Sequence, residues 1–190
     1  EYSMYKRYGE YVPKESAAEN VTVLRDSILI EYQGQKRTVH VYLPPDYGLD
    51  SNKRYPVMYF MDGAAAFNDM ENESPEWEVD EVINAAHAAG QATAIVFGIE
   101  NAEERDNEYT PWITQDIPKA HGEEFGDWLT RDFKTWVDSN YLTMPGVIHT
   151  SIGGISRSGM MAYYLLMDHP DVFGKALIQS PSMWVDPDKL

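Results

Sequence analysis

One serine in this sequence stands where a nucleophile could act. Ser156 lies in the stretch "GISRSG", residues 154–159, between an apolar run and the segment "MMAYYLLM". A sharp turn from a buried strand into a buried helix needs small residues two positions before and two positions after the turning residue, and Gly154 and Ser158 meet that need. The spacing matches a nucleophile elbow, G-x-S-x-G, with serine in place of the last glycine. The chemistry expected of such a serine is attack on an acyl carbonyl.

Acyl transfer also needs donors for the negative charge that develops on the carbonyl oxygen. In the elbow architecture one donor is the amide after the nucleophile, here that of Arg157, and the other comes from the loop after an earlier strand. The segment "MYFMDGAAAFND" fits that loop, because small alanines follow Asp62-Gly63 and leave the backbone approachable. The backbone amides of Ala64 and Arg157 are therefore the predicted oxyanion hole.

Both features also have purely structural explanations. Serine is a preferred helix N-cap, so Ser156 or Ser158 would serve equally well as a cap on the helix at Met160. Asp62-Gly63 is also a common turn sequence. The predicted strand before Ser156 and the predicted helix after it favour the nucleophile.

The remaining elements must position these groups, and their pattern predicts an α/β fold. Apolar strands alternate with helices, which is typical of a mainly parallel sheet with helices on both faces. The predicted strands are a hairpin within residues 21–45, and runs at 55–63, 92–100, 147–156 and 175–184. The last begins with the apolar run "KALIQS", residues 175–180, which has no further strand to cover it within the given sequence. The predicted helices are 77–90, 122–141 and 158–170. Residues 1–20 are expected to form an irregular arm, and residues 21–190 one domain.

Composition limits the partners of this domain. The formal net charge of −16 argues against nucleic acid and against an anionic membrane surface, because both need a basic footprint. No apolar run approaches the roughly 20 residues of a membrane span. Without cysteine, the chain has no disulfide, no cysteine nucleophile and no thiolate metal site. The chain opens at Glu1, which is compatible with removal of a leader or an upstream domain.

Several blocks of the sequence resemble the esterase family of α/β-hydrolases that includes enterochelin esterase, S-formylglutathione hydrolase, feruloyl and acetylxylan esterases, and the mycolyl transferases. The matching blocks are "VYLPPDY", "KRYPVMYFMDG", "VFGIENAEERDNEYTPW" and "IGGISRSGMMAYYLLMDHPDVFGKALIQSPSMW", in that order. They span nearly all of the chain from about Val39 onward. The resemblance implies the α/β-hydrolase fold, Ser156 as the acylated nucleophile, and Ala64 and Arg157 as backbone donors.

The resemblance also places the segment "RDNEYTPW", residues 105–112, near the cleft. Arg105 and Glu108 have the spacing of a local ion pair that shapes this loop, which is the interpretation we adopt. Trp112 and Trp184 each follow the end of a strand, where folds of this kind bind ligands. They are the predicted substrate-binding residues, and they would serve equally well as caps on the core.

The sequence departs from the family in two ways. A long cation, Arg157, follows the nucleophile, where it would cover the acyl site or meet an anionic substrate group. More seriously, the acid and the histidine of a triad should follow the serine in the chain, and no suitable pair lies between Ser156 and Leu190. Of the earlier histidines, only His121 lies on a loop that would fold over the cleft, and a solvated loop histidine is the alternative. We therefore expect an α/β-hydrolase that lacks its last strands, with the histidine and the acid located C-terminal to Leu190.

The sequence as a whole predicts a serine carboxylester hydrolase that works through an acyl-enzyme, without a metal or an organic cofactor. The expected partner is a small-molecule or carbohydrate ester, such as a feruloyl or acetyl ester or a siderophore trilactone. The aromatic-rich composition favours an aromatic acyl group. A catalytically impaired binding module and an acyl transferase remain as alternatives. The sequence does not indicate the compartment or the oligomeric state.

Overall fold

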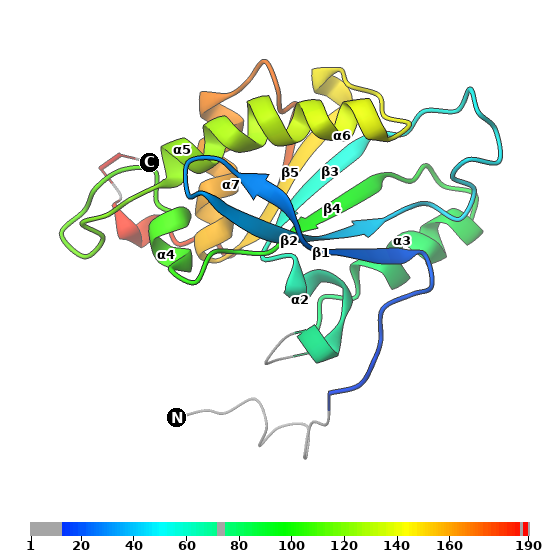
Figure 1. Ribbon diagram of the computed structural model, residues 1–190, viewed down its shortest axis with the longest axis horizontal. Coiled ribbons are helices and arrows are strands. Elements are labelled where there is room, and N and C mark those ends of the chain that lie inside the picture. The colour runs from blue at the N-terminus through cyan, green and yellow to red at the C-terminus, as the bar shows by residue number, and fades with distance from the viewer. Residues whose placement is uncertain (1–12, 72–74, 187, 190) are drawn as a thin grey trace.

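The computed structural model describes residues 13–71, 75–186 and 188–189. Its centre is one six-stranded sheet with the strand order β1-β2-β4-β3-β5-β6 (Figure 1). The strands are β1 (Val21–Ile30), β2 (Gln35–Tyr42), β3 (Val57–Met61), β4 (Ile95–Ile99), β5 (Thr150–Ile155) and β6 (Lys175–Gln179).

The sheet is antiparallel at one side and parallel elsewhere. β1 and β2 form the predicted hairpin, and β2 pairs antiparallel with β4. β4, β3, β5 and β6 then run parallel to one another. This arrangement confirms the predicted mainly parallel sheet. Because parallel strands have their carboxyl ends at the same end of the sheet, the loops after β3, β4, β5 and β6 meet there.

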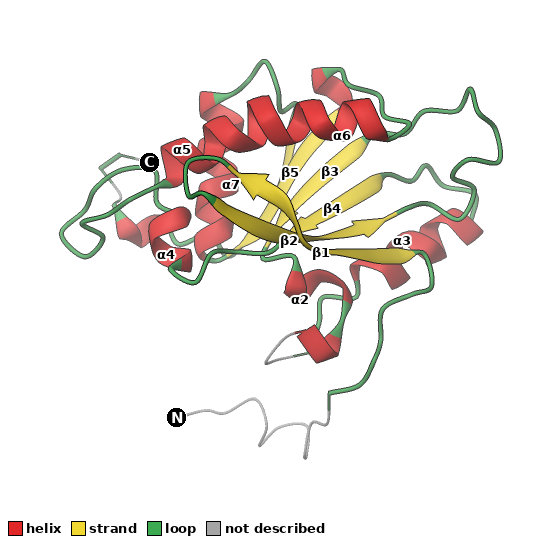
Figure 2. Cartoon of the chain, viewed as in Figure 1, coloured by secondary structure: helices red, strands yellow, loops and turns green. Residues whose placement is uncertain are grey.

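Helices cover both faces of the sheet (Figure 2). One face packs against α5 (Gly122–Asp127), α6 (Lys134–Asn140) and α7 (Arg157–Asp168), whose apolar side chains share a core with Tyr59 of β3. The other face packs against α2 (Ala64–Phe67) and α3 (Val79–Ala88), in a smaller core around Phe60. The alternation of Tyr59 and Phe60 follows from the two-residue period of a strand. A short helix, α4 (Arg105–Glu108), follows β4.

Single-turn 3₁₀ helices connect some of these elements, namely η1 (Asp69–Glu71), η3 (Val147–His149) and η4 (Met183–Val185). The predicted helix 122–141 is one continuous rod, but its middle, η2 (Trp128–Phe133), is π-helical. In the part of the chain that the structure describes, no helix has both the length and the apolar character needed to cross a membrane.

The last strand differs from its prediction. Residues 175–184 were expected to form a strand whose apolar run, 175–180, further strands would cover, and the observed strand is shorter. β6 ends at Gln179, and it forms an edge of the described sheet, so its side chains alternate between exposed and half-buried and Leu177 is 47 % exposed. The strand stops at Gln179 because Ser180 has a φ of 43° and Pro181 follows it, and neither residue continues a strand ladder.

The predicted irregular arm is described only from residue 13 onward, and residues 1–12 lie outside the described residues. The described part has no regular structure before β1. It is attached to the domain by the Ala18 amide, which donates a hydrogen bond to Asp80 Oδ2 of α3 at 2.7 Å.

Candidate active site

Ser156 sits at the tip of a strained turn between β5 and α7. Its φ of 62° and ψ of −116° are unusual for a residue with a side chain, and strain of this kind clusters at active sites. Ser156 occupies the N-cap position of α7, but its side chain makes no capping hydrogen bond, and the residue is exposed. The elbow prediction requires this arrangement, and the cap alternative does not account for it.

The loop after β6 holds this turn in place. The Ser156 amide donates to the Gln179 carbonyl at 3.0 Å, and the Ser182 amide donates to the Ser156 carbonyl at 3.0 Å. Both backbone groups of Ser156 are thus hydrogen-bonded, which helps to offset the cost of its dihedral angles. The Ser182 hydroxyl oxygen lies 3.2 Å from that of Ser156.

Gly154 is needed because the turn folds back on itself. A Cβ at this position would lie 2.3 Å from the Ser158 carbonyl oxygen and 2.4 Å from its carbon, both of them backbone atoms that cannot move aside. Gly146, in contrast, has room for a side chain, since a Cβ there would approach no closer than 3.9 Å to His149.

We expect Gly154→Ala to destabilise the protein by about 1–3 kcal/mol, because the turn must open to relieve this overlap. Gly146→Ala is the matched control and should change the free energy of unfolding by less than about 0.5 kcal/mol. Urea denaturation of both variants measures the difference. Equal stabilities of the two variants would show that the turn is looser than described.

The loop after β3 approaches the same point. Asp62 has a φ of 58°, and Gly63 packs so closely on β4 that a Cβ there would lie 2.2 Å from the Gly98 carbonyl carbon. The chain then enters α2 at Ala64, just as it enters α7 at Arg157. The amide of the first residue of a helix has no acceptor within that helix, so Ala64 and Arg157 each bring a donor to this end of the sheet.

A polar network joins the two loops beneath the elbow. The Asp62 carboxylate accepts two hydrogen bonds from Arg105, at 2.6 and 2.7 Å, and one from the Ser158 hydroxyl at 2.6 Å. The Ser158 side chain is completely buried. Its hydroxyl oxygen accepts a hydrogen bond from the Ile155 amide at 2.9 Å and lies 2.9 Å from the Ile155 carbonyl oxygen. Side chains from α4, the β3 loop and α7 thereby fix the backbone on either side of Ser156.

The expected ion pair between Arg105 and Glu108 is wrong. Arg105 pairs with Asp62. Glu108 instead pairs with Arg37 of β2 at 2.8 Å, and the side chains of Glu108 and Arg37 are both buried. The cause is the direction of the side chains: α4 presents Arg105 to the β3 loop and Glu108 to the core. Sequence spacing alone could not reveal partners 43 and 71 positions away.

A pocket of about 290 Å³ opens beside Ser156 at the carboxyl end of the sheet. It is lined by Asp62, Ala64, Ala65, Trp77, Asn101, Arg105, Ile155 and Ser156. The structure therefore brings two of the predicted site residues, Ser156 and Ala64, to one cavity. Trp77 and Asn101 also line it, although no motif in the sequence marks them.

Other predicted site residues lie elsewhere. Trp112 packs edge-on against Tyr164 of α7, with ring centroids 6.0 Å apart, and does not line the pocket. Trp184 is 74 % exposed, and the Arg157 guanidinium lies over its ring, 5.7 Å from the centroid. The same guanidinium pairs with Asp106 at 3.2 Å, so the Arg157 side chain is directed away from the pocket.

None of the five histidines lines the pocket. His149 belongs to η3, which lies directly before β5 and therefore at the amino ends of the parallel strands, away from Ser156. The other four each lie near a carboxylate outside the pocket: His40 is 2.8 Å from Glu100, His87 is 3.4 Å from Asp46, His121 is 3.7 Å from Glu124, and His169 is 3.4 Å from Asp168. The described residues therefore supply no imidazole to Ser156.

Residues 30–189 match the family described as Putative esterase. The chain belongs to this family. A 164-residue stretch is 24 % identical to the uncharacterized protein YbbA of Bacillus subtilis (strain 168), covering 83 % of this chain and 62 % of that protein. Membership agrees with the resemblance drawn from the sequence blocks.

Several solved structures share the fold of this chain. The BES protein from Bacillus cereus has a TM-score of 0.70 at 21 % identity, covering 92 % of this chain and 66 % of its own. A ferulic acid esterase has a TM-score of 0.66 at 21 % identity, with coverages of 91 % and 62 %. The siderophore hydrolase EstA from Aspergillus nidulans has a TM-score of 0.67 at 20 % identity, with coverages of 88 % and 59 %. The chain thus spans between 59 and 66 % of the length of these similar proteins.

Proposed function

We propose that this protein is a serine carboxylester hydrolase with Ser156 as its nucleophile. The observation that carries the proposal is the backbone of Ser156, which is held at φ 62° by hydrogen bonds to Gln179 and Ser182 while its side chain stays exposed and caps nothing. A structural serine does not require this conformation. The pocket beside it supplies space for an acyl group.

The proposed reaction has two halves. The Ser156 oxygen attacks the ester carbonyl as its proton passes to a base, and the amides of Ala64 and Arg157 stabilise the oxyanion that forms. The tetrahedral intermediate then expels the alcohol, which takes the proton from the base, and leaves an acyl group on Ser156. Water, deprotonated by the same base, attacks the acyl-serine, and the acid is released as the Ser156 oxygen takes the proton back from the base.

The base is the part of this mechanism that the described residues do not supply. A serine is a weak nucleophile without one, and no histidine lines the pocket. We propose that a histidine and its orienting carboxylate come from outside these 190 residues. The family relationship supports this proposal, since members of this fold carry the acid and the histidine after the serine in the chain.

An aromatic acyl group fits the pocket best among the expected substrates. Trp77 provides a broad apolar wall, Ile155 a second apolar surface, and Asn101 and Arg105 provide hydrogen-bond donors. This arrangement suits a planar acyl group with polar substituents, as in feruloyl or catecholate esters. The name of a ferulic acid esterase among the similar structures supports an aromatic acyl group.

Trp77→Ala should raise the KM for a feruloyl ester about tenfold and leave the KM for an acetyl ester within about twofold, because only the larger acyl group reaches the tryptophan. Trp184→Ala and Trp112→Ala are the matched controls and should leave both values nearly unchanged. Steady-state kinetics on methyl ferulate and nitrophenyl acetate measure these effects. A rise in the KM for the feruloyl ester alone in Trp112→Ala or Trp184→Ala would instead place the acyl group against that tryptophan.

The proposed function is tested with the purified full-length protein. It should hydrolyse nitrophenyl acetate, and a stoichiometric amount of a fluorophosphonate should abolish that activity. Chelators should not affect the rate on this small ester. Failure to hydrolyse nitrophenyl, feruloyl and catecholate esters, or full activity after fluorophosphonate treatment, would contradict the proposal.

A non-catalytic binding module is the second candidate, and it is favoured by one observation, namely that no histidine lines the pocket. Such a module should bind aromatic esters without turnover and should not react with the fluorophosphonate. An acyl transferase would share every proposed residue and would differ in transferring the acyl group to an alcohol faster than to water.

A further inference from the structure

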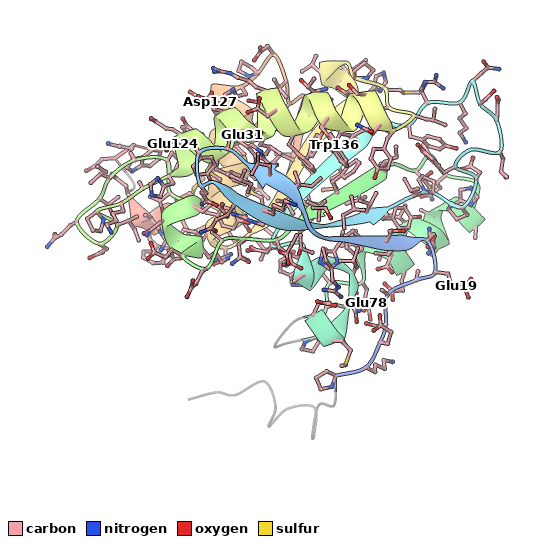
Figure 3. All side chains as sticks on the ribbon, in the orientation of Figure 1. Glu19, Glu31, Glu78, Glu124, Asp127 and Trp136 are labelled. Atoms are coloured by element: carbon pink, nitrogen blue, oxygen red, sulfur yellow. The ribbon has the colours of Figure 1, made fainter. Side chains whose placement is uncertain are left out.

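Three carboxylates meet on the face of the sheet opposite α6. Glu76 comes from the loop before α3, and Asp80 and Glu81 belong to the first turn of that helix. One oxygen from each of the three lies within 4.8 Å of the others. In Figure 3, Glu78 marks this part of the molecule, close to α2 and α3.

Two buried oxygens of this cluster lack donors among the described residues. Asp80 is completely buried, and although its Oδ2 accepts the Ala18 amide, its Oδ1 has no hydrogen-bond partner among the described residues. Glu76 Oε2 is also buried and has no hydrogen-bond partner among the described residues. A buried carboxylate oxygen that receives no hydrogen bond costs folding free energy, so a ligand is expected to satisfy it.

No ion pair with a protein cation neutralises the cluster within the described ranges. The lysines, arginines and histidines that form ion pairs there do so with other carboxylates. Burial raises the pKa of Glu76, Asp80 and Glu81, and repulsion from neighbouring carboxylates raises each pKa further. A bound proton or a bound cation would relieve this repulsion.

We propose that Glu76, Asp80 and Glu81 bind one hard divalent cation, with Ca²⁺ the best match. All three ligands are oxygens, which suit hard cations rather than soft metals. Ca²⁺ accepts irregular sets of oxygen ligands and completes its shell with water, and the exposed side chain of Glu81 leaves the site open to solvent.

The cation would also fix one wall of the pocket. Trp77 lies directly after Glu76, and its amide donates to the Ala65 carbonyl at 2.9 Å, next to the proposed oxyanion amide. The Glu76 amide donates to Asp69 Oδ1 at 2.9 Å. A cation that joins Glu76 to α3 therefore restrains the segment that carries Trp77. This consequence rests on the proposed function, whereas cation binding itself does not.

Calorimetric titration of the chelator-treated full-length protein with CaCl₂ tests the site. We expect one Ca²⁺ per chain, with a Kd of roughly 10⁻⁵ to 10⁻³ M and a rise in Tm on binding. Asp80→Asn and Glu81→Gln should each weaken binding at least about tenfold, because each removes a charged ligand. Asp80→Asn keeps a side-chain oxygen for the Ala18 amide, and Glu81 is exposed, so the second variant should fold even if the first does not.

Glu78→Gln is the matched control, because it removes one nearby charge but no ligand oxygen. It should weaken binding less than about threefold. Equal weakening in Glu78→Gln and Glu81→Gln would overturn the site in favour of diffuse attraction to an acidic surface. Absence of saturable binding below about 5 mM CaCl₂, with the Tm unchanged, would overturn it in favour of a shared proton. Titration with MgCl₂ should give weaker binding than CaCl₂, and the reverse order would contradict the assignment to Ca²⁺.

Discussion

Replacing Ser156 with alanine should lower kcat/KM for nitrophenyl acetate at least about 10⁴-fold and leave the free energy of unfolding nearly unchanged. Loss of the nucleophile removes the acyl-enzyme route, and only binding and oxyanion stabilisation remain. Stability should persist, since the Ser156 side chain makes no capping bond and the hydrogen bonds of its backbone remain. Steady-state kinetics and urea denaturation provide the two measurements.

Ser182→Ala is the matched control for that variant. Its hydroxyl lies 3.2 Å from that of Ser156, so it is the neighbouring serine most able to act instead. We expect a loss of less than about tenfold in kcat/KM, because the proposed oxyanion amides and the strained turn are untouched. A loss in Ser182→Ala that equals the loss in Ser156→Ala would mean that Ser156 is not the sole nucleophile.

Asp62→Asn should lower kcat by about 10- to 100-fold while KM changes less than about threefold. Asp62 is a positioning residue, since its carboxylate joins Arg105 to the Ser158 hydroxyl and so holds the oxyanion loop against the elbow. Displacement of a donor by a fraction of an ångström weakens transition-state binding more than ground-state binding. Because a loss of folded protein would also lower the apparent kcat at unchanged KM, kcat is calculated per folded molecule, with the folded fraction measured by circular dichroism.

Asp106→Asn provides the control for charge removal in the same region. Asp106 pairs with the Arg157 side chain at 3.2 Å and more weakly with Arg105 at 3.7 Å, and no hydrogen bond in the described network joins it to Asp62 or Ser158. It should change kcat less than about threefold. In a double-mutant cycle, Asp62→Asn and Ser158→Ala should be non-additive, since each removes the same hydrogen bond. If the losses in activation free energy were additive, Asp62 and Ser158 would act independently, which would contradict the network.

Sequence reasoning succeeded where a local pattern has one physical solution. The apolar runs predicted the strands, and the small residues at 154 and 158 predicted a sharp turn, because nothing larger than glycine fits at 154 where the turn folds back. The family resemblance followed from blocks in order and is confirmed. The predicted strand 175–184 is shorter in the structure, since β6 ends at Gln179, before the positive φ of Ser180 and before Pro181.

The residue that forms the pocket wall, Trp77, could not be predicted from the sequence for a different reason. Trp77 lies in the segment before α3 and lines the pocket, because its amide donates a hydrogen bond to the carbonyl of Ala65 in α2. Trp112 and Trp184 follow strand ends, which was the basis for choosing them, but their rings pack against Tyr164 and Arg157 instead. Non-local contacts of this kind leave no periodic signal in the sequence.

The most direct test of the central claim is to locate a fluorophosphonate adduct by mass spectrometry of the digested full-length protein. We predict a single adduct on Ser156, and none after Ser156→Ala. An adduct on Ser158, on Ser182 or on a residue outside the elbow, or no adduct in an active enzyme, would contradict the claim that this strained turn presents the nucleophile.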